Sequence, residues 1–245
     1  MINIIKFKSR KDCEIYNDRE RLYSRISSLE ELYSEYISLE PHCFLHAGVI
    51  SNTIKKKNLN GISAISIGID ILKESTLVKN NNLNIDVFDI DKKAVALANK
   101  FSYELQISDT LKYFEQNILS EDFRIQKGYE ILILSQMDYI FSDKDIELLL
   151  KKISMAKIKY ILIITPSIYS FSPSPYKTLD LIKSLLSCIK SNLITNPKKY
   201  FTTYKRRESY FLSLFRKHFY CDYKFDYVYP SGREYLFLLK SKKSA

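Results

Sequence analysis

The sequence predicts an α/β protein built on a doubly wound, mostly parallel sheet that closes with an antiparallel hairpin. Two observations predict it. Short apolar runs alternate with helical stretches from Gly61 to residue 166, and two strand-like runs flank a PSG turn near the C-terminus. The alternation is typical of βαβ units, whereas the short turn is typical of a hairpin. We therefore expect residues 61–245 to form one core and residues 1–60 to form a helical cap.

The expected cap contains two helical stretches. In SSLEELYSEYISLE, Ser28 and Glu31 have the spacing of a capping box, and apolar side chains recur on one face. The stretch FLHAGVISNTIKK continues the helical layer until NLNG ends it.

Five apolar runs are expected to form the parallel strands. They are ISAISI, NIDVF, LKYFE, EILIL and YILII, which begin at Ile62, Asn84, Leu111, Glu130 and Tyr160. Each has the length of a strand, and helical patterns lie between them.

The helical patterns between the runs have clear apolar faces. DKKAVALANKFSYEL places Ala94, Ala98 and Phe101 on one side, with Asp91 as N-cap, and SDKDIELLLKKISM begins with Ser142 as N-cap. The last two runs, FYCDYKFDYVY and REYLFLLK, predict the closing hairpin.

Composition narrows the class of protein. The chain has 245 residues, which suits one domain of ordinary size. No window has the roughly 18 apolar residues of a membrane span, and the start is too charged for a signal peptide, so a cytoplasmic protein is expected. Four well-separated cysteines indicate neither disulfides nor a zinc site, and no metal is expected. The net charge of +10 favours nucleic acid, acidic membranes or anionic metabolites, or reflects a Lys- and Ile-rich composition.

The place to search for a ligand follows from the fold. In open α/β sheets, ligands bind outside the carboxyl ends of the strands, near the reversal of the winding. The first strand ends in SIGID, where Gly68 either lets the backbone approach a ligand or makes a plain turn. The second ends in VFDID, where Asp89 lies at the spacing of about 20 residues that suits a carboxylate accepting from ribose hydroxyls.

A family resemblance now emerges from the order of the motifs. ISAISIGID, IDVFDIDKKAVALANK, YFEQNIL, YEILILSQMDYIFSDKDIELLLKKI and KYILIITPS resemble the successive motifs of class I S-adenosylmethionine-dependent methyltransferases. The resemblance covers residues 61–166, and the hairpin also fits, because that family's Rossmann-like, seven-stranded sheet ends with an antiparallel strand. It implies S-adenosylmethionine as cofactor and S-adenosylhomocysteine as product.

The resemblance also implies site residues. The loop at Gly68 would face the methionine part of the cofactor, and Asp89 would hold the ribose. Asn117 and Ile118 would flank the adenine, and Gln136 would lie beside the reacting sulfonium. The expected cofactor-binding residues are Ser66, Gly68, Ile69, Asp70, Asp89, Ile90, Asn117, Ile118, Ser135 and Gln136.

The first motif departs from the family pattern. That family has an acidic residue followed by glycines at alternate positions, where this chain has Ser66, Gly68, Asp70 and Leu72. The Asp70 side chain either contacts the methionine ammonium or indicates a remodelled or empty pocket. Whether the loop still binds the cofactor is left open by the sequence.

Methyl transfer mainly requires alignment of the acceptor and, for a hydroxyl, a base that removes its proton. His46, just before the core, is the first candidate for the base, with a packed histidine as the alternative. Asp138 and Tyr139 follow the fourth strand and are further candidate catalytic residues. SIYSFSPSPYKTLD, after the fifth strand, is expected to be a lid or an ordinary loop.

These features favour O-methylation of a small-molecule acceptor that is anionic or sugar-linked. NPKKYFTTYKRRESYFLSLFRKHFY interleaves basic and aromatic residues as a nucleic-acid groove does, although its helical half is expected to pack apolar residues inward. SQMD in place of NPPY or DPPY argues against amino-methylation of DNA bases. An RNA methyltransferase, transfer of the cofactor's aminobutyl group, and a catalytically silent binding protein stay open. The inward residues are Tyr210, Phe211, Leu214, Phe215 and Phe219.

Overall fold

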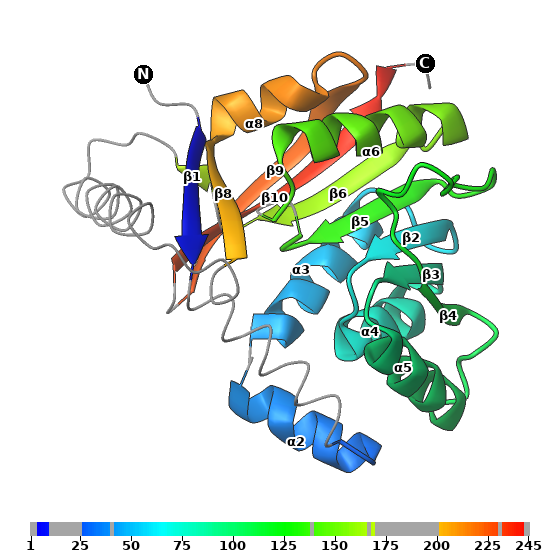
Figure 1. Cartoon of the computed structure of the whole chain (residues 1–245). Helices are drawn as coiled ribbons and strands as arrows, with labels where there is room; N and C mark the ends of the chain where they lie inside the picture. The colour runs from blue at the N-terminus through cyan, green and yellow to red at the C-terminus, as the bar shows by residue number, and fades with distance from the viewer. Residues whose placement is uncertain are drawn as a thin grey trace.

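The computed structural model describes residues 4–9, 26–39, 42–137, 140–165, 168–169, 201–229 and 232–242. These residues form a seven-stranded sheet with helices on both faces and a separate three-stranded sheet (Figure 1). None of the described helices is long and apolar enough to cross a bilayer.

The large sheet has the strand order β4-β3-β2-β5-β6-β10-β9. The pairs among β2 to β6 are parallel, and β10 pairs antiparallel with both β6 and β9. The winding reverses between β2 and β5, which lie side by side in the middle, so the carboxyl ends of these two strands mark the switch point. The strands are β2 (Ser63–Ile67), β3 (Asn84–Asp89), β4 (Leu111–Glu115), β5 (Ile131–Ser135), β6 (Tyr160–Thr165), β9 (Phe219–Tyr229) and β10 (Gly232–Ser241).

Two apolar clusters separate the sheet from its helices. Along β2, Ala64 belongs to the cluster under α3, α4 and α5, and Ile65 belongs to the cluster under α6 and α8. This is the alternation that a strand covered on both faces requires. The helices are α2 (Leu29–Leu39), α3 (His42–Lys56), α4 (Ile71–Asn81), α5 (Lys92–Glu104), α6 (Asp143–Ala156) and α8 (Glu208–Phe215).

The predicted core elements are confirmed. All five parallel strands, the closing hairpin and the helices between β3 and β4 and between β5 and β6 lie where the apolar patterns placed them. Asp91 caps α5 by accepting from the N–H groups of Lys93 and Ala94. Ser142 forms a capping box with Asp145 at the start of α6. The doubly wound fold class is therefore correct.

The N-terminal segment differs from the expectation in one respect. It contains the helices α2 and α3, and Ile4–Ser9 forms the strand β1, which the prediction of a helical cap over residues 1–60 did not include. The helix α3 packs against α4, with Ile50 and Ile54 fully buried in the same cluster as the sheet. The division into a cap and a core stays a prediction.

The small sheet has the order β1-β8-β7, with β7 at Ile168–Tyr169 and β8 at Phe201–Arg207. Arg206 of β8, buried to 1% exposure, donates to Asp143 Oδ1 at 2.8 Å and to the Phe141 carbonyl at 2.5 Å. Asp143 begins α6, the helix that follows β5. Arg206 therefore ties the small sheet to the large sheet on the side where the parallel strands have their carboxyl ends.

The segment after β8 follows the prediction in part. Phe211, Phe215 and Phe219 are buried as expected. Leu214 packs against the same cluster while only partly buried, and Tyr210 donates its hydroxyl to Asp143 at 2.6 Å. Most of the proposed lid, SIYSFSPSPYKTLD, lies outside the described residues.

Candidate functional site

Gly68 occupies the turn from β2 to α4 in a conformation that favours glycine. Its φ is +80°, and a Cβ at this position would lie 2.8 Å from the Met137 sulfur. Its N–H donates to the Phe88 carbonyl at 3.0 Å, which holds the loop against the end of β3. The turn and the close packing of Met137 therefore both depend on the absence of a side chain at Gly68.

Asp89, the last residue of β3, reaches back to the same loop. Its Oδ2 accepts from the Ile69 N–H at 3.0 Å, and its Oδ1 accepts from the Asp91 N–H at 2.9 Å. Each carboxylate oxygen has a second acceptor site. Asp89 can therefore accept from two further hydroxyls while it keeps the loop in place.

A second carboxylate, that of Glu74 in α4, forms hydrogen bonds with the loop from the protein interior. Glu74, in the first turn of α4, accepts from the Asp70 N–H at 2.9 Å and from the Ser66 hydroxyl at 3.2 Å, and it pairs with Lys73 Nζ at 3.0 Å. Burial raises the pKa of the Glu74 carboxyl to about 7, although the Lys73 ammonium opposes the shift. The Asp70 carboxylate itself accepts from the Lys73 N–H and caps α4. It is thus turned toward the helix.

These contacts determine the charge of the ligand that fits. The successive N–H groups of Ile69 and Asp70 would be donors to a phosphate in a phosphate-binding loop, but here both donate to carboxylates. The carboxylates of Asp70 and Asp89 add negative charge at the same helix start, whereas the buried Glu74 is paired with Lys73. A pyrophosphate is therefore disfavoured, whereas a ligand with a cationic group and vicinal hydroxyls is favoured.

The expected adenine side lies at the ends of β3 and β4. Ile90 is 65% exposed directly after Asp89, while Ile118 is buried. Asn117 uses its Oδ1 to accept from the Leu119 N–H at 2.9 Å, so the side chain shapes its own turn. This turn is held by Lys152 of α6, whose ammonium donates to the carbonyls of Ile118, Ser120 and Phe123.

At the end of β5, Gln136 brings together three elements. It has φ +56°, which is uncommon for a residue with a side chain, and follows Ser135, the last residue of the strand. Its Nε2 donates to Glu234 Oε1 at 2.7 Å and lies 3.3 Å from His46 Nε2. His46 Nε2 in turn lies 2.6 Å from Glu234 Oε2. A buried cluster of His46, Gln136 and Glu234 thus joins α3, β5 and β10 beside the switch point.

The predicted site residues therefore fall into four groups, one of which is the expected adenine side described above. The structure brings the glycine loop and Asp89 together, and it brings His46 to Gln136. Asp138 and Tyr139 lie outside the described residues. The sequence did not predict that Glu74, Lys152 and Glu234 contribute to the site. No group of three or more side chains that could hold a metal occurs within the described parts of the chain.

Comparison with known proteins identifies the fold. No model of a known family and no curated protein sequence matches the chain. The chain matches the magnesium protoporphyrin IX methyltransferase ChlM of Synechocystis PCC 6803, solved with bound SAH (S-adenosylhomocysteine), with a TM-score of 0.62 and 12% identity over 94% of each chain. The chain has the fold of the class I S-adenosylmethionine-dependent methyltransferases.

Two larger proteins share this methyltransferase fold. The mitomycin 7-O-methyltransferase MmcR has a TM-score of 0.59 and 14% identity, with 90% of this chain and 60% of that chain covered. The S-adenosylmethionine-dependent methyltransferase SibL has a TM-score of 0.62 and 17% identity, with coverages of 90% and 62%. The chain thus spans about three fifths of the length of these two proteins.

Proposed function

We propose that the protein is an S-adenosylmethionine-dependent methyltransferase that methylates a hydroxyl of a small molecule. The observation that carries the proposal is the pair of carboxylates, Asp89 and Glu74, that bind successive N–H groups of the loop after β2. Lys73 balances the charge of the buried Glu74, so the negative charge at the switch point comes from Asp89 and Asp70. It suits a cofactor with a sulfonium, an ammonium and ribose hydroxyls.

The residues present fit this cofactor. Gly68 supplies the left-handed turn, with φ +80°, that places the loop at the end of β2. The exposed Ile90 offers an apolar surface next to Asp89. We assign the ribose hydroxyls to Asp89, the methionine part to residues 66–70, the adenine to Ile90 with residues 117–118, and the region of the sulfonium to residues 135–136. The bound cofactor would supply the activated methyl group.

His46 is our candidate for the base that accepts the hydroxyl proton. In the neutral tautomer whose Nε2–H donates to Glu234, the basic lone pair lies on Nδ1. Glu234 then fixes the ring orientation, as a carboxylate does for the histidine of a catalytic triad. Asp138 and Tyr139 remain proposed acceptor-side residues on the resemblance alone.

The chemical class of the acceptor has separate support. MmcR is a mitomycin 7-O-methyltransferase and ChlM is a magnesium protoporphyrin IX methyltransferase, and both names refer to small-molecule acceptors. The proposal that the acceptor is anionic or sugar-linked rests on the net charge of +10. Glu234, which accepts from Gln136, is acidic, so the support for an anionic acceptor is the charge of the whole chain and not these contacts.

The first test is cofactor binding by wild type, Asp89→Ala and Asp91→Ala. S-adenosylhomocysteine at about 100 times its dissociation constant adds roughly 2.7 kcal/mol of stability, which corresponds to a rise of about 5 to 10 °C in Tm. We expect this rise in wild type and its loss in Asp89→Ala. Asp91→Ala is the matched control, because it removes the cap of α5, a loss of about 1 kcal/mol, while leaving the Asp91 N–H on Asp89.

The outcomes separate the alternatives. No stabilisation of the wild type would contradict the proposed cofactor and favour the catalytically silent binding protein. If the cofactor binds, the release of S-adenosylhomocysteine in the presence of hydroxylated small molecules, compared with RNA, distinguishes the two acceptor classes. A methyl group found on RNA would refute the small-molecule proposal.

A further inference from the structure

Glu74 is a buried carboxylate that the proposed chemistry does not use. Its side chain has 0% exposure, so it cannot touch a ligand bound above the loop. Burying a charged group is costly unless it is paired and hydrogen-bonded. Lys73 supplies the charge partner, but the two hydrogen bonds to Ser66 and Asp70 both go to the loop.

The two bonds span the turn at Gly68. Ser66 lies two residues before the glycine and Asp70 two residues after it, and one carboxylate accepts from both. These two hydrogen bonds, from Ser66 and Asp70 to Glu74, hold the loop from inside the molecule, and we call them the clamp. Asp89 holds Ile69 from the neighbouring strand.

The clamp also accounts for Asp70, where a side chain stands close to the expected ligand. Because the Asp70 N–H is held by Glu74, the backbone orientation at this residue is fixed. The Asp70 carboxylate then accepts from the Lys73 N–H at 3.2 Å and caps α4. The Asp70 carboxylate is therefore engaged with α4.

We propose that Glu74 is a positioning residue that holds loop 66–70 in its cofactor-binding shape and thereby sets the affinity for the cofactor. The inference rests on the proposed function. The family's first motif has an acidic residue where this chain has Ser66 and a glycine where it has Asp70. In this proposal Glu74, a residue of α4, compensates for both differences.

The test compares two double variants that both remove the ion pair. In Lys73→Met/Glu74→Gln, the amide oxygen can still accept from the Asp70 N–H and the amide nitrogen can donate to the Ser66 hydroxyl. In Lys73→Met/Glu74→Leu, neither bond can form. Replacement of a buried ion pair by apolar residues often leaves stability unchanged or raised, so the variants differ mainly in how they hold the loop.

Calorimetric titration with S-adenosylhomocysteine gives the first readout. We expect the Gln variant to bind within about threefold of wild type and the Leu variant to bind at least about tenfold more weakly. Equal affinities of the Gln and Leu variants would overturn the proposal.

Hydrogen exchange of the Asp70 amide gives a second readout that needs no cofactor. We expect exchange to be at least about tenfold faster in the Leu variant and to stay protected in the Gln variant. If wild type fails to bind S-adenosylhomocysteine, the proposed function fails, and the exchange rates still test the clamp. Unchanged protection in the Leu variant would refute it.

Discussion

Substitution of Gly68 by alanine tests whether the loop after β2 is a built site or a plain turn. The left-handed conformation costs a residue with a Cβ roughly 1 to 2 kcal/mol. The added Cβ would also lie 2.8 Å from the Met137 sulfur, closer than any normal contact, so Met137 must move as well. Because Met137 is a flexible side chain, its displacement should add about 1 kcal/mol, the low end of the roughly 1 to 3 kcal/mol typical of overpacking. We therefore expect Gly68→Ala to lose about 2 to 3 kcal/mol of unfolding free energy in urea.

Two other glycines separate the strain from the contact. Gly61 has φ +76° with open space around its Cβ position, so Gly61→Ala should lose about 1 to 2 kcal/mol from strain alone. Gly48 lies inside α3 with nothing near its Cβ position, and Gly48→Ala should gain about 0.5 to 1 kcal/mol. S-adenosylhomocysteine binding should weaken only in Gly68→Ala. If Gly68→Ala resembles Gly61→Ala in stability and binds the ligand like wild type, the reasoning about Met137 and the loop is wrong.

Three further predictions concern stability. Lys152→Met removes the donor to three loop carbonyls and should cost about 2 to 3 kcal/mol in urea unfolding, with no such loss at an exposed lysine such as Lys144. Ser142→Ala breaks the capping box of α6 and should lower the unfolding free energy by about 1 kcal/mol. Because the pKa of Glu74 rises from 4.5 to about 7 on folding, the native state holds a proton that the unfolded state releases, so this group should lower stability as pH rises from about 4.5 to 7, by an amount on the order of 1 to 3 kcal/mol. The trend should vanish in Lys73→Met/Glu74→Gln, and a trend of equal size there would contradict the assignment.

The fold was predictable because its main signal is local. Each parallel strand is a short apolar run, and each helix shows its buried face within one stretch of sequence. The pairing of β1 with β8 was not predictable in this way, since Ile4 and Arg206 meet across almost the whole chain. The local sequence of a short strand at the edge of a small sheet does not indicate which other strand it pairs with.

The candidate site was predictable only where strand ends carry it. Gly68 and Asp89 follow adjacent parallel strands, so their proximity follows from the fold. Glu74 lies in an amphipathic helix and Glu234 in a strand that follows a turn, where a lone acidic residue is usually solvated. Only the packing of α4 and α3 against the sheet shows that both carboxylates are buried.

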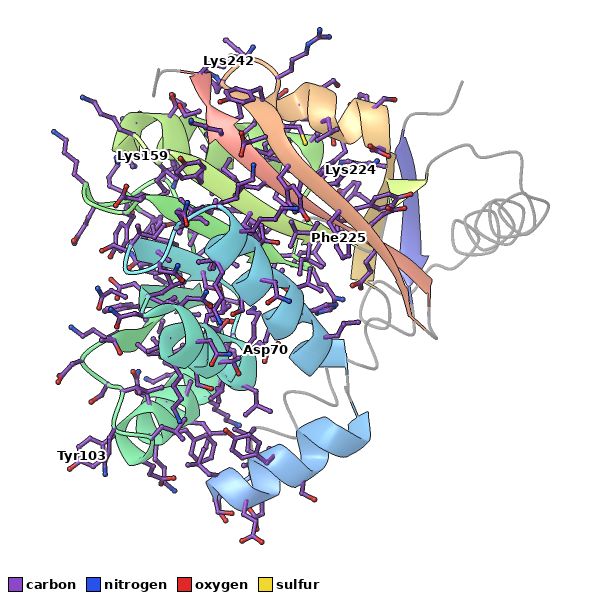
Figure 2. All side chains as sticks on the ribbon, turned by 180° about the vertical axis from the view of Figure 1, so that it is seen from behind. Asp70, Tyr103, Lys159, Lys224, Phe225 and Lys242 are labelled. Atoms are coloured by element: carbon purple, nitrogen blue, oxygen red, sulfur yellow. The ribbon has the colours of Figure 1, made fainter. Side chains whose placement is uncertain are left out.

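The charge of the site is opposite in sign to the charge of the chain. The net charge is +10, yet the loop after β2 is surrounded by Asp70, Glu74 and Asp89. In Figure 2, Asp70 lies in the middle of the view, whereas Lys159 and Lys242 lie at the periphery. Lys159 precedes β6 and is therefore at the amino ends of the parallel strands, the edge opposite the site. The carboxylates of Asp70 and Asp89 therefore attract a cationic cofactor at close range, while Lys73 is paired with Glu74. Described lysines such as Lys159 repel the cofactor from a distance.

The attraction by the loop carboxylates and the repulsion by the distant lysines differ in their response to salt. At physiological ionic strength the screening length is about 8 Å, so salt weakens the distant repulsion more than the close contacts. Raising salt from 50 to 200 mM should therefore leave the affinity for S-adenosylmethionine unchanged within about threefold, or strengthen it. An RNA acceptor held by the basic surface would lose affinity by orders of magnitude over the same range. Calorimetry at both salt concentrations measures the difference, and a steep loss of cofactor affinity would show that the carboxylates at the loop do not determine which ligand binds.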